Sequence, residues 1–349
     1  MGKQRRTVLL LALLLIGALF VAIWLGAQKY FRRPLRLLWK IHAGMNLLRL
    51  KFTPDGKWLV GANSFQIALW DVATGQLLSM FNRYHDEFDI SPNGKFFAIG
   101  MSDSVELWEF PNWKKLWTRW ANHWGTIKRL NFSPDGQFIA TSGSDSLTVK
   151  LWRVKDGGLE KVFWVKGLID FAFSPDGQVL ATSRTTDSGY EVLMWDVSRK
   201  NFIGVLKGGE LHDVVVNLLQ TREQMRLKFG GQLIGFSPDG ELLAAREAKG
   251  VRVWDVTTCK QVGLRKSWSF GFHTEGIFVT IDQVSFAHRW HWHILKFERA
   301  EDFKIVGAMF LDRMPSETSA SLEFSPDRKR VAVWESDGTI WLFERREKR

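Results

Sequence analysis

The sequence predicts an all-β domain built from seven repeated sheets and preceded by one transmembrane α-helix. Three observations lead to this prediction. A short turn motif occurs seven times, an aliphatic run ending in an aromatic residue follows each copy, and a long uncharged segment lies near the N-terminus. Recurrence of one structural unit at a regular spacing is the signature of a repeat architecture.

The turn motif reads Phe-Ser-Pro-Asp-Gly. It is intact at residues 132–136, 173–177 and 236–240, nearly intact at 52–56, 90–94 and 324–328, and degenerate at 272–276. Ser, Pro, Asp and Gly in this order suit the four positions of a type I β-turn, because proline presets φ and glycine closes the turn. Each copy is therefore expected to form the tip of a β-hairpin.

A hydrophobic strand is expected about a dozen residues after each tip. These strands are rich in β-branched and aliphatic residues, and each contains an aromatic residue at its end, usually followed by an acid. They are predicted at residues 67–71, 105–109, 149–152, 192–196, 251–255, 294–298 and 340–344.

The pairing of this turn with a Val-x-Leu-Trp-Asp strand resembles the WD40 repeat, and the resemblance covers residues 35–344. The first residues of the seven turns are 38, 42, 41, 63, 36 and 52 positions apart, a mean of about 45. WD40 repeats measure about 40–45 residues, and each forms one four-stranded blade of a ring. The resemblance therefore implies a seven-bladed WD40-like β-propeller.

The N-terminal region divides into a basic tail at residues 1–6, an uncharged run at 7–28 and a linker at 29–34. A helix as long as this run spans roughly 33 Å, enough to cross a hydrocarbon core of about 30 Å. A cleaved signal peptide is the alternative, but its apolar core is usually about 7–15 residues long and ends at a small-residue site, which Leu25 and Ala27 match poorly. We therefore predict an uncleaved, single-pass membrane anchor.

The distribution of charge argues against nucleic acid as a partner. Residues 1–40 carry +8 of the net charge of +11, so the rest of the chain, including the charged tail at 345–349, carries +3. A nearly neutral propeller lacks the basic footprint of a nucleic-acid-binding domain.

Basic residues flank the anchor on both sides, so the positive-inside rule does not select the side of the membrane that the propeller occupies. The single cysteine, Cys259, excludes an intramolecular disulfide.

The two ends of the repeat region are predicted to meet. The last repeat ends at Phe343, after its third strand, and is one strand short. Residues 35–41 read as a strand that completes this last sheet, as the N-terminal strand does in WD40 propellers, and closure removes the open sheet edges. The result is expected to be a monomeric closed ring.

The third repeat carries the fullest polar signature. The resemblance to WD40 proteins implies that His123, Ser142, Asp145 and Trp152 form a buried, hydrogen-bonded tetrad. Buried polar groups need partners that a repeat supplies internally, so we expect this tetrad to be structural and not catalytic.

Two stretches are candidates for a partner-binding surface. Within the gap of 63 residues, residues 210–228 show apolar residues at helical spacing, which predicts an amphipathic helical insertion that packs on the ring, binds a partner or lies on the membrane. A second candidate is a tryptophan-rich outer strand and loop interleaved with basic residues. This composition is typical of interface hot spots and of membrane interfaces, and packing between blades is the structural alternative. The candidate residues are Trp113, Trp117, Trp120 and Trp124 of this strand and loop, and Val214, Leu218 and Arg222 of the insertion.

The sequence contains no sign of catalysis or of a cofactor. It has no P-loop, dinucleotide fingerprint, nucleophile elbow or zinc-protease motif, and its recurring aspartates are turn residues. His291 and His293 share one face of a predicted strand, but two ligands are too few for a metal site.

We therefore predict a membrane-anchored WD40 scaffold that binds a protein or peptide. One alternative is a propeller enzyme or cofactor binder, such as a quinoprotein, acting in the central channel. The other is a periplasmic propeller resembling TolB, released by signal cleavage.

Overall fold

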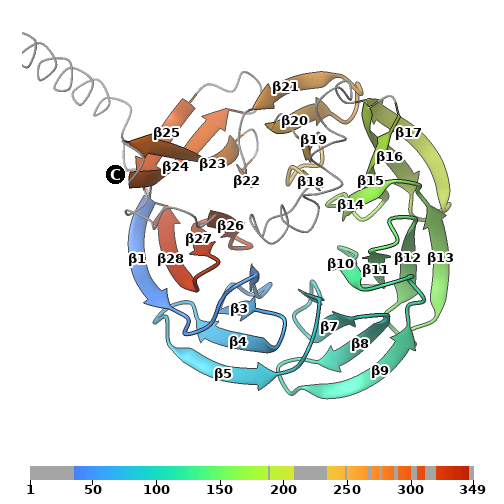
Figure 1. Ribbon diagram of the computed structural model, residues 1–349, viewed down its shortest axis with the longest axis horizontal. Helices are drawn as coiled ribbons and strands as arrows, with labels where there is room; N and C mark the ends of the chain where they lie inside the picture. The colour runs from blue at the N-terminus through green and yellow to red at the C-terminus, as the bar shows by residue number, and fades with distance from the viewer. Residues whose placement is uncertain are drawn as a thin grey trace, which may run out of the picture.

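The computed structural model describes residues 35–187, 189–207, 234–247, 250–265, 269–274, 277–286, 290–299, 305–310 and 320–345. These residues form seven four-stranded antiparallel sheets arranged as a ring (Figure 1). The prediction of an all-β propeller is confirmed. The predicted anchor at 7–28 and the predicted insertion at 210–228 lie outside the described residues. Within the described ranges, no helix has the length and apolar character that a membrane span requires.

The first four sheets follow one another along the chain. The first contains β2 (Arg49–Phe52), β3 (Trp58–Ala62), β4 (Gln66–Asp71) and β5 (Leu77–Asn82). The second contains β6 (Glu87–Ile90), β7 (Phe96–Met101), β8 (Ser104–Glu109) and β9 (Lys114–Trp120). The third contains β10 (Ile127–Phe132), β11 (Phe138–Gly143), β12 (Thr148–Arg153) and β13 (Leu159–Trp164). The fourth contains β14 (Leu168–Phe173), β15 (Val179–Thr186), β16 (Gly189–Asp196) and β17 (Asn201–Lys207).

The remaining three sheets complete the ring. The fifth contains β18 (Ile234–Phe236), β19 (Leu242–Glu247), β20 (Gly250–Asp255) and β21 (Gln261–Arg265). The sixth contains β22 (Ser269–Thr274), β23 (Ile277–Phe286), β24 (Trp290–Arg299) and β25 (Ile305–Phe310). The seventh contains β26 (Ala320–Phe324), β27 (Arg330–Glu335), β28 (Thr339–Arg345) and, from the start of the repeat region, β1 (Leu35–His42).

The Ser-Pro-Asp-Gly turns connect the first and second strands of their sheets. In the third sheet, the Ser133 hydroxyl and the Gln137 backbone N–H both donate to Asp135 Oδ1. The Ser133 hydroxyl also accepts a bond of 2.9 Å from the Phe138 backbone N–H at the start of β11. The aspartate and the serine thus hold the turn closed, which is the local role expected for the recurring acids.

Neighbouring turns also contact one another around the ring. A Cβ atom added to Gly177 would lie 3.5 Å from Pro134 in the preceding turn, and one added to Gly240 would lie 3.5 Å from Pro175. The same relation links the first and last sheets, because a Cβ on Gly56 would lie 3.9 Å from a side-chain atom of Pro326. The turns therefore form an interlocked series at one end of the sheets, which we call the turn side.

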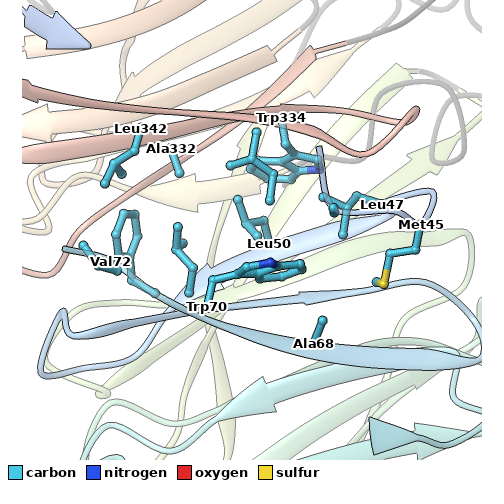
Figure 2. Close-up of a cluster of buried hydrophobic side chains, with 13 residues drawn as sticks. Met45, Leu47, Leu50, Ala68, Trp70, Val72, Ala332, Trp334 and Leu342 are labelled. Carbon is cyan, nitrogen blue, oxygen red and sulfur yellow. The ribbon is translucent and has the colours of Figure 1, made fainter. Parts of the chain in front are cut away.

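The two ends of the described chain meet in the seventh sheet. β1 pairs with β28, and Leu35 lies opposite Arg345. A hydrophobic cluster joins the first sheet to the last, with Leu50 and Trp70 facing Trp334 (Figure 2). Trp39 of β1 donates its indole N–H to the Val72 carbonyl over 2.8 Å. Residues 35–41 thus occupy the fourth-strand position of the seventh sheet.

The fourth strands lie on the outside of the ring (Figure 1), and each of the seven described ones has a one-residue register irregularity next to the aromatic residue of the third strand. In the second sheet, Leu107 pairs with Trp117 while Trp108 pairs with Lys115, so Leu116 is the extra residue. In the first sheet the extra residue is Leu78. A bulge changes the direction of the side chains that follow it. The outer surface of the ring therefore departs from simple alternation.

Candidate protein-binding surface

The polar network predicted in the third sheet exists, with one residue different. Trp152 donates its indole N–H to Thr141 Oγ1 over 2.9 Å, and His123 Nε2 lies 3.0 Å from the same oxygen. On its other side, His123 Nδ1 lies 3.3 Å from Thr148 Oγ1 and 4.0 Å from Asp145 Oδ2. The network thus joins the loop before β10 to three successive elements of the sheet.

The prediction that Ser142 supplies the hydroxyl is wrong. Ser142 is buried, but the bonds are made by its neighbour Thr141. The register explains the difference. Ile139 lies opposite Trp152, so Thr141, two residues further along β11, is on the same face as Trp152, whereas Ser142 lies opposite Val149 on the other face. Side chains alternate between the faces of a strand, so a shift of one residue moves a side chain to the other face.

The buried His123 belongs to the loop that carries the exposed Trp124, and hydrogen bonds hold this loop. Burial, and to a smaller extent the nearby Lys150, lower the pKa of His123 to about 4 against the opposing effect of Asp145. The His123 imidazole is therefore neutral at physiological pH. Lys150 also donates to the backbone carbonyls of Ala121 and Asn122 over 2.7 and 2.8 Å. The loop that carries Trp124 is thus fixed from beneath by the network and by this lysine.

The four tryptophans proposed as a partner surface have two different roles. Trp113 packs in an aromatic cluster, stacked on Phe81 with ring centroids 4.8 Å apart. Trp117 donates its indole N–H to the Val154 carbonyl of the third sheet over 2.9 Å. Trp120 and Trp124 are 68% and 84% exposed. The first pair therefore stabilises the ring, and the second pair remains a candidate for binding.

A third exposed tryptophan, which was not predicted from the sequence, lies at the same end of the sheets as these two. Trp164 is 72% exposed and ends β13, opposite Thr148, as Trp120 ends β9, opposite Ser104. The signal was present in the sequence, since each follows the tryptophan of its third strand by 12 positions. The strands β9 and β13 are neighbours along the outside of the ring (Figure 1).

The first sheet extends this aromatic surface. Phe65 and Tyr84 are 67% and 44% exposed, and their rings contact each other at a centroid distance of 5.9 Å. The neighbouring His85 is buried and its pKa is lowered by that burial, which repeats the pairing of a buried histidine with an exposed aromatic seen in the next loop. We call Trp120, Trp124 and Trp164, together with Phe65 and Tyr84, the aromatic rim. It lies at the end of the sheets opposite the turn side.

The first strands carry a separate set of charges. Lys51 Nζ in the first sheet lies 2.7 Å from Asp89 Oδ1 in the second sheet. Arg129 Nε in the third sheet lies 3.1 Å from Asp170 Oδ1 in the fourth sheet. Burial lowers the pKa of Arg129, but Asp170 and other nearby carboxylates outweigh it and raise the pKa above its ordinary value. These ion pairs connect neighbouring sheets, so we assign them to the frame of the ring.

Sequence reasoning missed these inner charges, although a signal was available. Each of these charged residues lies shortly before the residue that begins a turn. Arg49, Glu87 and Arg129 lie three positions before it, and Lys51 and Asp89 lie one position before it. Alternating charges before a recurring turn place both side chains on one face of the first strand.

Three candidate residues and the histidine pair are not tested by the geometry. Val214, Leu218 and Arg222 lie outside the described residues. The backbone of β24 includes His291 and His293, but their side chains are not among those described. Among the described residues, no group of three or more histidine, cysteine, aspartate or glutamate side chains is arranged to hold a metal ion.

Comparisons with known proteins agree with the ring of repeats. Residues 113–153 match the family model described as WD domain, G-beta repeat. The chain is similar to Protein HIR1 of Candida albicans, with 30% identity over 36% of this chain and 16% of that protein. It is also similar to an uncharacterized WD repeat-containing protein of Synechocystis, with 30% identity over 32% of each chain. The guanine nucleotide-binding protein subunit beta of Oryza sativa subsp. japonica is 30% identical over 32% of this chain and 33% of its own.

These similarities are partial, because the matched segments span at most about a third of the length of these relatives. The matched family model covers the second-sheet outer strand and most of the third sheet, including His123, Thr141 and Trp152. Together with the closed ring of four-stranded sheets, the matches support a β-propeller that contains a WD40 repeat at residues 113–153 and is similar to WD40-repeat proteins.

Proposed function

We propose that this protein is a membrane-anchored scaffold that binds a protein partner through its aromatic rim and performs no catalysis of its own. The observation that carries the proposal is the exposure of Trp120, Trp124 and Trp164, at 68%, 84% and 72%. Large aromatic side chains on a rigid support are typical anchors of protein interfaces, because they bury much area at a small cost in conformational entropy.

The relatives favour the same class of function. WD40 propellers generally bind proteins, and one relative is named as a subunit, which is part of an assembly. The polar groups of the third sheet serve the frame, since Thr141 bonds both His123 and Trp152. The inner charges form ion pairs between sheets, which supports a structural role for them as well.

A membrane anchor at residues 7–28 remains part of the proposal. The described chain enters the ring at the turn side. Arg330 directly follows the last turn and lies opposite Glu344. The next residue, Arg345, lies opposite Leu35, where the described chain begins. An anchor followed by a linker of a few residues would then hold the turn side nearer the bilayer. The aromatic rim, at the other end of the sheets, would face away from the membrane and stay accessible to a partner.

Affinity purification from detergent-solubilised membranes tests the binding role. The full chain is compared with a Trp120→Ala, Trp124→Ala, Trp164→Ala variant and with a control variant, Leu77→Ala, Leu78→Ala, Phe202→Ala, which removes exposed apolar side chains from outer strands. We expect the rim variant to lose at least about tenfold of the specifically retained partner while the control keeps it. Equal recovery with both variants would contradict the proposal. Deletion of residues 210–228 separately tests the predicted insertion.

The anchor is tested on the same membranes. We expect the full chain to stay with the bilayer after alkaline carbonate extraction and to retain its N-terminus. A mature N-terminus near Gln28, or release into the supernatant, would show instead that the segment is cleaved.

A further inference from the structure

We infer that a cleft between the second and third sheets, distinct from the aromatic rim, binds an acidic peptide segment through a large apolar side chain. The cleft has a volume of about 690 Å³. Its lining is mostly apolar and also contains two basic residues; it includes Phe96, Leu116, Trp117 and Phe138 together with Arg153 and Lys155. The cleft would be a second binding site, in addition to the proposed binding through the aromatic rim.

The bulge in β9 brings an apolar side chain to this cleft. Leu116 is the extra residue of the strand and is 43% exposed, although leucine side chains are usually buried. Trp117, the next residue, is fixed by its bond of 2.9 Å to the Val154 carbonyl. The cleft is therefore lined by a tryptophan that a hydrogen bond holds in place and by a neighbouring leucine that is partly exposed.

The charges around the cleft leave a modest positive surplus. The segments 106–120 and 153–161 contain six lysines and arginines and four carboxylates, Glu106, Glu109, Asp156 and Glu160. Glu106 is engaged by Lys115 over 3.3 Å, and the lining residue Lys155 is exposed. Asp156 and Glu160 lie in the second of these segments. Both carboxylates are already engaged, since Arg153 lies 3.1 Å from Asp156 and 2.9 Å from Glu160, and Lys200 also contacts Glu160. The surplus positive charge favours an anionic partner, and salt should weaken its binding.

The position of the cleft separates it from the rim. It is lined by Gly136 and Gln137 of the turn between β10 and β11 and by residues after β12, which places it at the turn side. A peptide is favoured because the lining combines apolar and aromatic side chains, which can receive a large apolar side chain, with the basic residues Arg153 and Lys155.

Fluorescence anisotropy on the full chain in detergent tests the inference. The probe is a fluorescein-labelled peptide in which a Leu-Phe pair is flanked on both sides by aspartates and glutamates. Two matched peptides replace the apolar pair by serines or the acids by glutamines. We expect saturable binding of the probe, at least about tenfold weaker binding of each matched peptide, and weakening at high salt.

Two variants of the cleft are compared with two matched controls. Leu116→Asp and Lys155→Glu should each weaken probe binding at least about tenfold. Leu78→Asp changes the same bulge position in the first sheet, and Lys57→Glu makes the same charge change at an exposed lysine outside the cleft. Both controls should stay within about twofold of the unaltered chain.

Other results of these experiments would contradict peptide binding at the cleft. Absence of saturable binding, equal loss in the controls, or equal binding of all three peptides would overturn the inference. Displacement of the probe by a soluble short-chain phosphatidylserine as effectively as by unlabelled peptide would assign the cleft to lipid headgroups and overturn the peptide assignment. The rim variant Trp120→Ala, Trp124→Ala, Trp164→Ala should bind the probe normally, so failure of the rim proposal and failure of the cleft inference are distinguishable.

Discussion

At the scale of single residues, the hydroxyl of Thr141 is the centre of the buried network in the third sheet. It bonds the Trp152 indole and lies within hydrogen-bonding distance of His123. Replacing it with a methyl group of similar size would leave both partners buried without that bond, a loss that usually costs about 1–3 kcal/mol.

We therefore expect Thr141→Val to lower the free energy of unfolding by about 1–3 kcal/mol, as measured by urea denaturation followed by circular dichroism. Ser142→Ala is the matched control, because Ser142 is also buried but lies on the other face of β11. A larger effect from Ser142→Ala than from Thr141→Val would restore the network predicted from the sequence.

The histidine of the same network makes stability depend on pH. Its pKa is about 4 in the folded chain against an ordinary value of 6.5, so the unfolded chain binds the proton more readily. The stabilising contribution of neutral His123 is fully present above pH 6.5 and is lost as the pH falls toward 4.

Between pH 6.5 and pH 5 we expect the free energy of unfolding to fall by about 1.5 kcal/mol more in the unaltered chain than in His123→Gln. Urea denaturation at the two pH values measures this difference. His85 is present in both proteins, so its own titration cancels in the comparison. Parallel pH profiles for the two proteins would show that His123 keeps an ordinary pKa.

At the scale of elements, the turns act as an interlocked unit and not only as hairpin tips. Gly177 has φ of +72°, and an added Cβ would lie 3.5 Å from Pro134 of the neighbouring turn. We expect Gly177→Ala to destabilise the chain by about 1–2 kcal/mol, because an L-residue is strained in this conformation.

The matched control for this substitution is Gly204→Ala in β17. Gly204 is not among the positive-φ residues, and an added Cβ would meet no atom within 4 Å. Its substitution should change the thermal midpoint little or raise it slightly. A loss at Gly204 equal to that at Gly177 would remove the argument from turn geometry.

The outer strands lock neighbouring sheets through tryptophan side chains. Trp39 and Trp117 occupy equivalent positions next to a bulge and donate to the carbonyls of Val72 and Val154 over 2.8 and 2.9 Å. Trp39→Phe removes one such bond from the strand that joins the two ends of the ring. We expect a loss of about 1–2 kcal/mol in the free energy of unfolding, whereas Trp120→Phe at the exposed rim should have no measurable effect. Equal stability of the two variants would contradict a role for Trp39 in holding β1.

Turns and third strands could be predicted from the sequence because their signals are local. A type I turn and an aliphatic strand depend on residues a few positions apart, and the strand expected at 251–255 is found within β20 at Gly250–Asp255. The roles of Trp113, Trp117, Trp120 and Trp124 could not be separated, because a bulge breaks the alternation and contact with the next sheet decides which side chain is buried. Thr141 was missed for a similar reason, since only the register shows which of two adjacent hydroxyls faces Trp152.

At the scale of the whole molecule, the two proposed binding sites lie at opposite ends of the sheets. The turn side receives the chain from its N-terminal region and carries the basic cleft, and the opposite end carries the aromatic rim. Ion pairs between the first strands, such as Lys51 with Asp89, and the β1–β28 pairing connect the sheets into one frame. A rigid frame of this kind suits a scaffold, because binding does not require the support to become ordered.

The most direct measurement of this account is photo-crosslinking in native membranes with a benzophenone amino acid placed at single positions. Trp124 and Trp164 report on the aromatic rim, and the exposed turn residues Lys57 and Lys95 report on the opposite end. The account predicts that the two rim positions yield the same discrete protein adduct and that the two turn positions do not. The same adduct from the turn positions, with none from the rim, would contradict it.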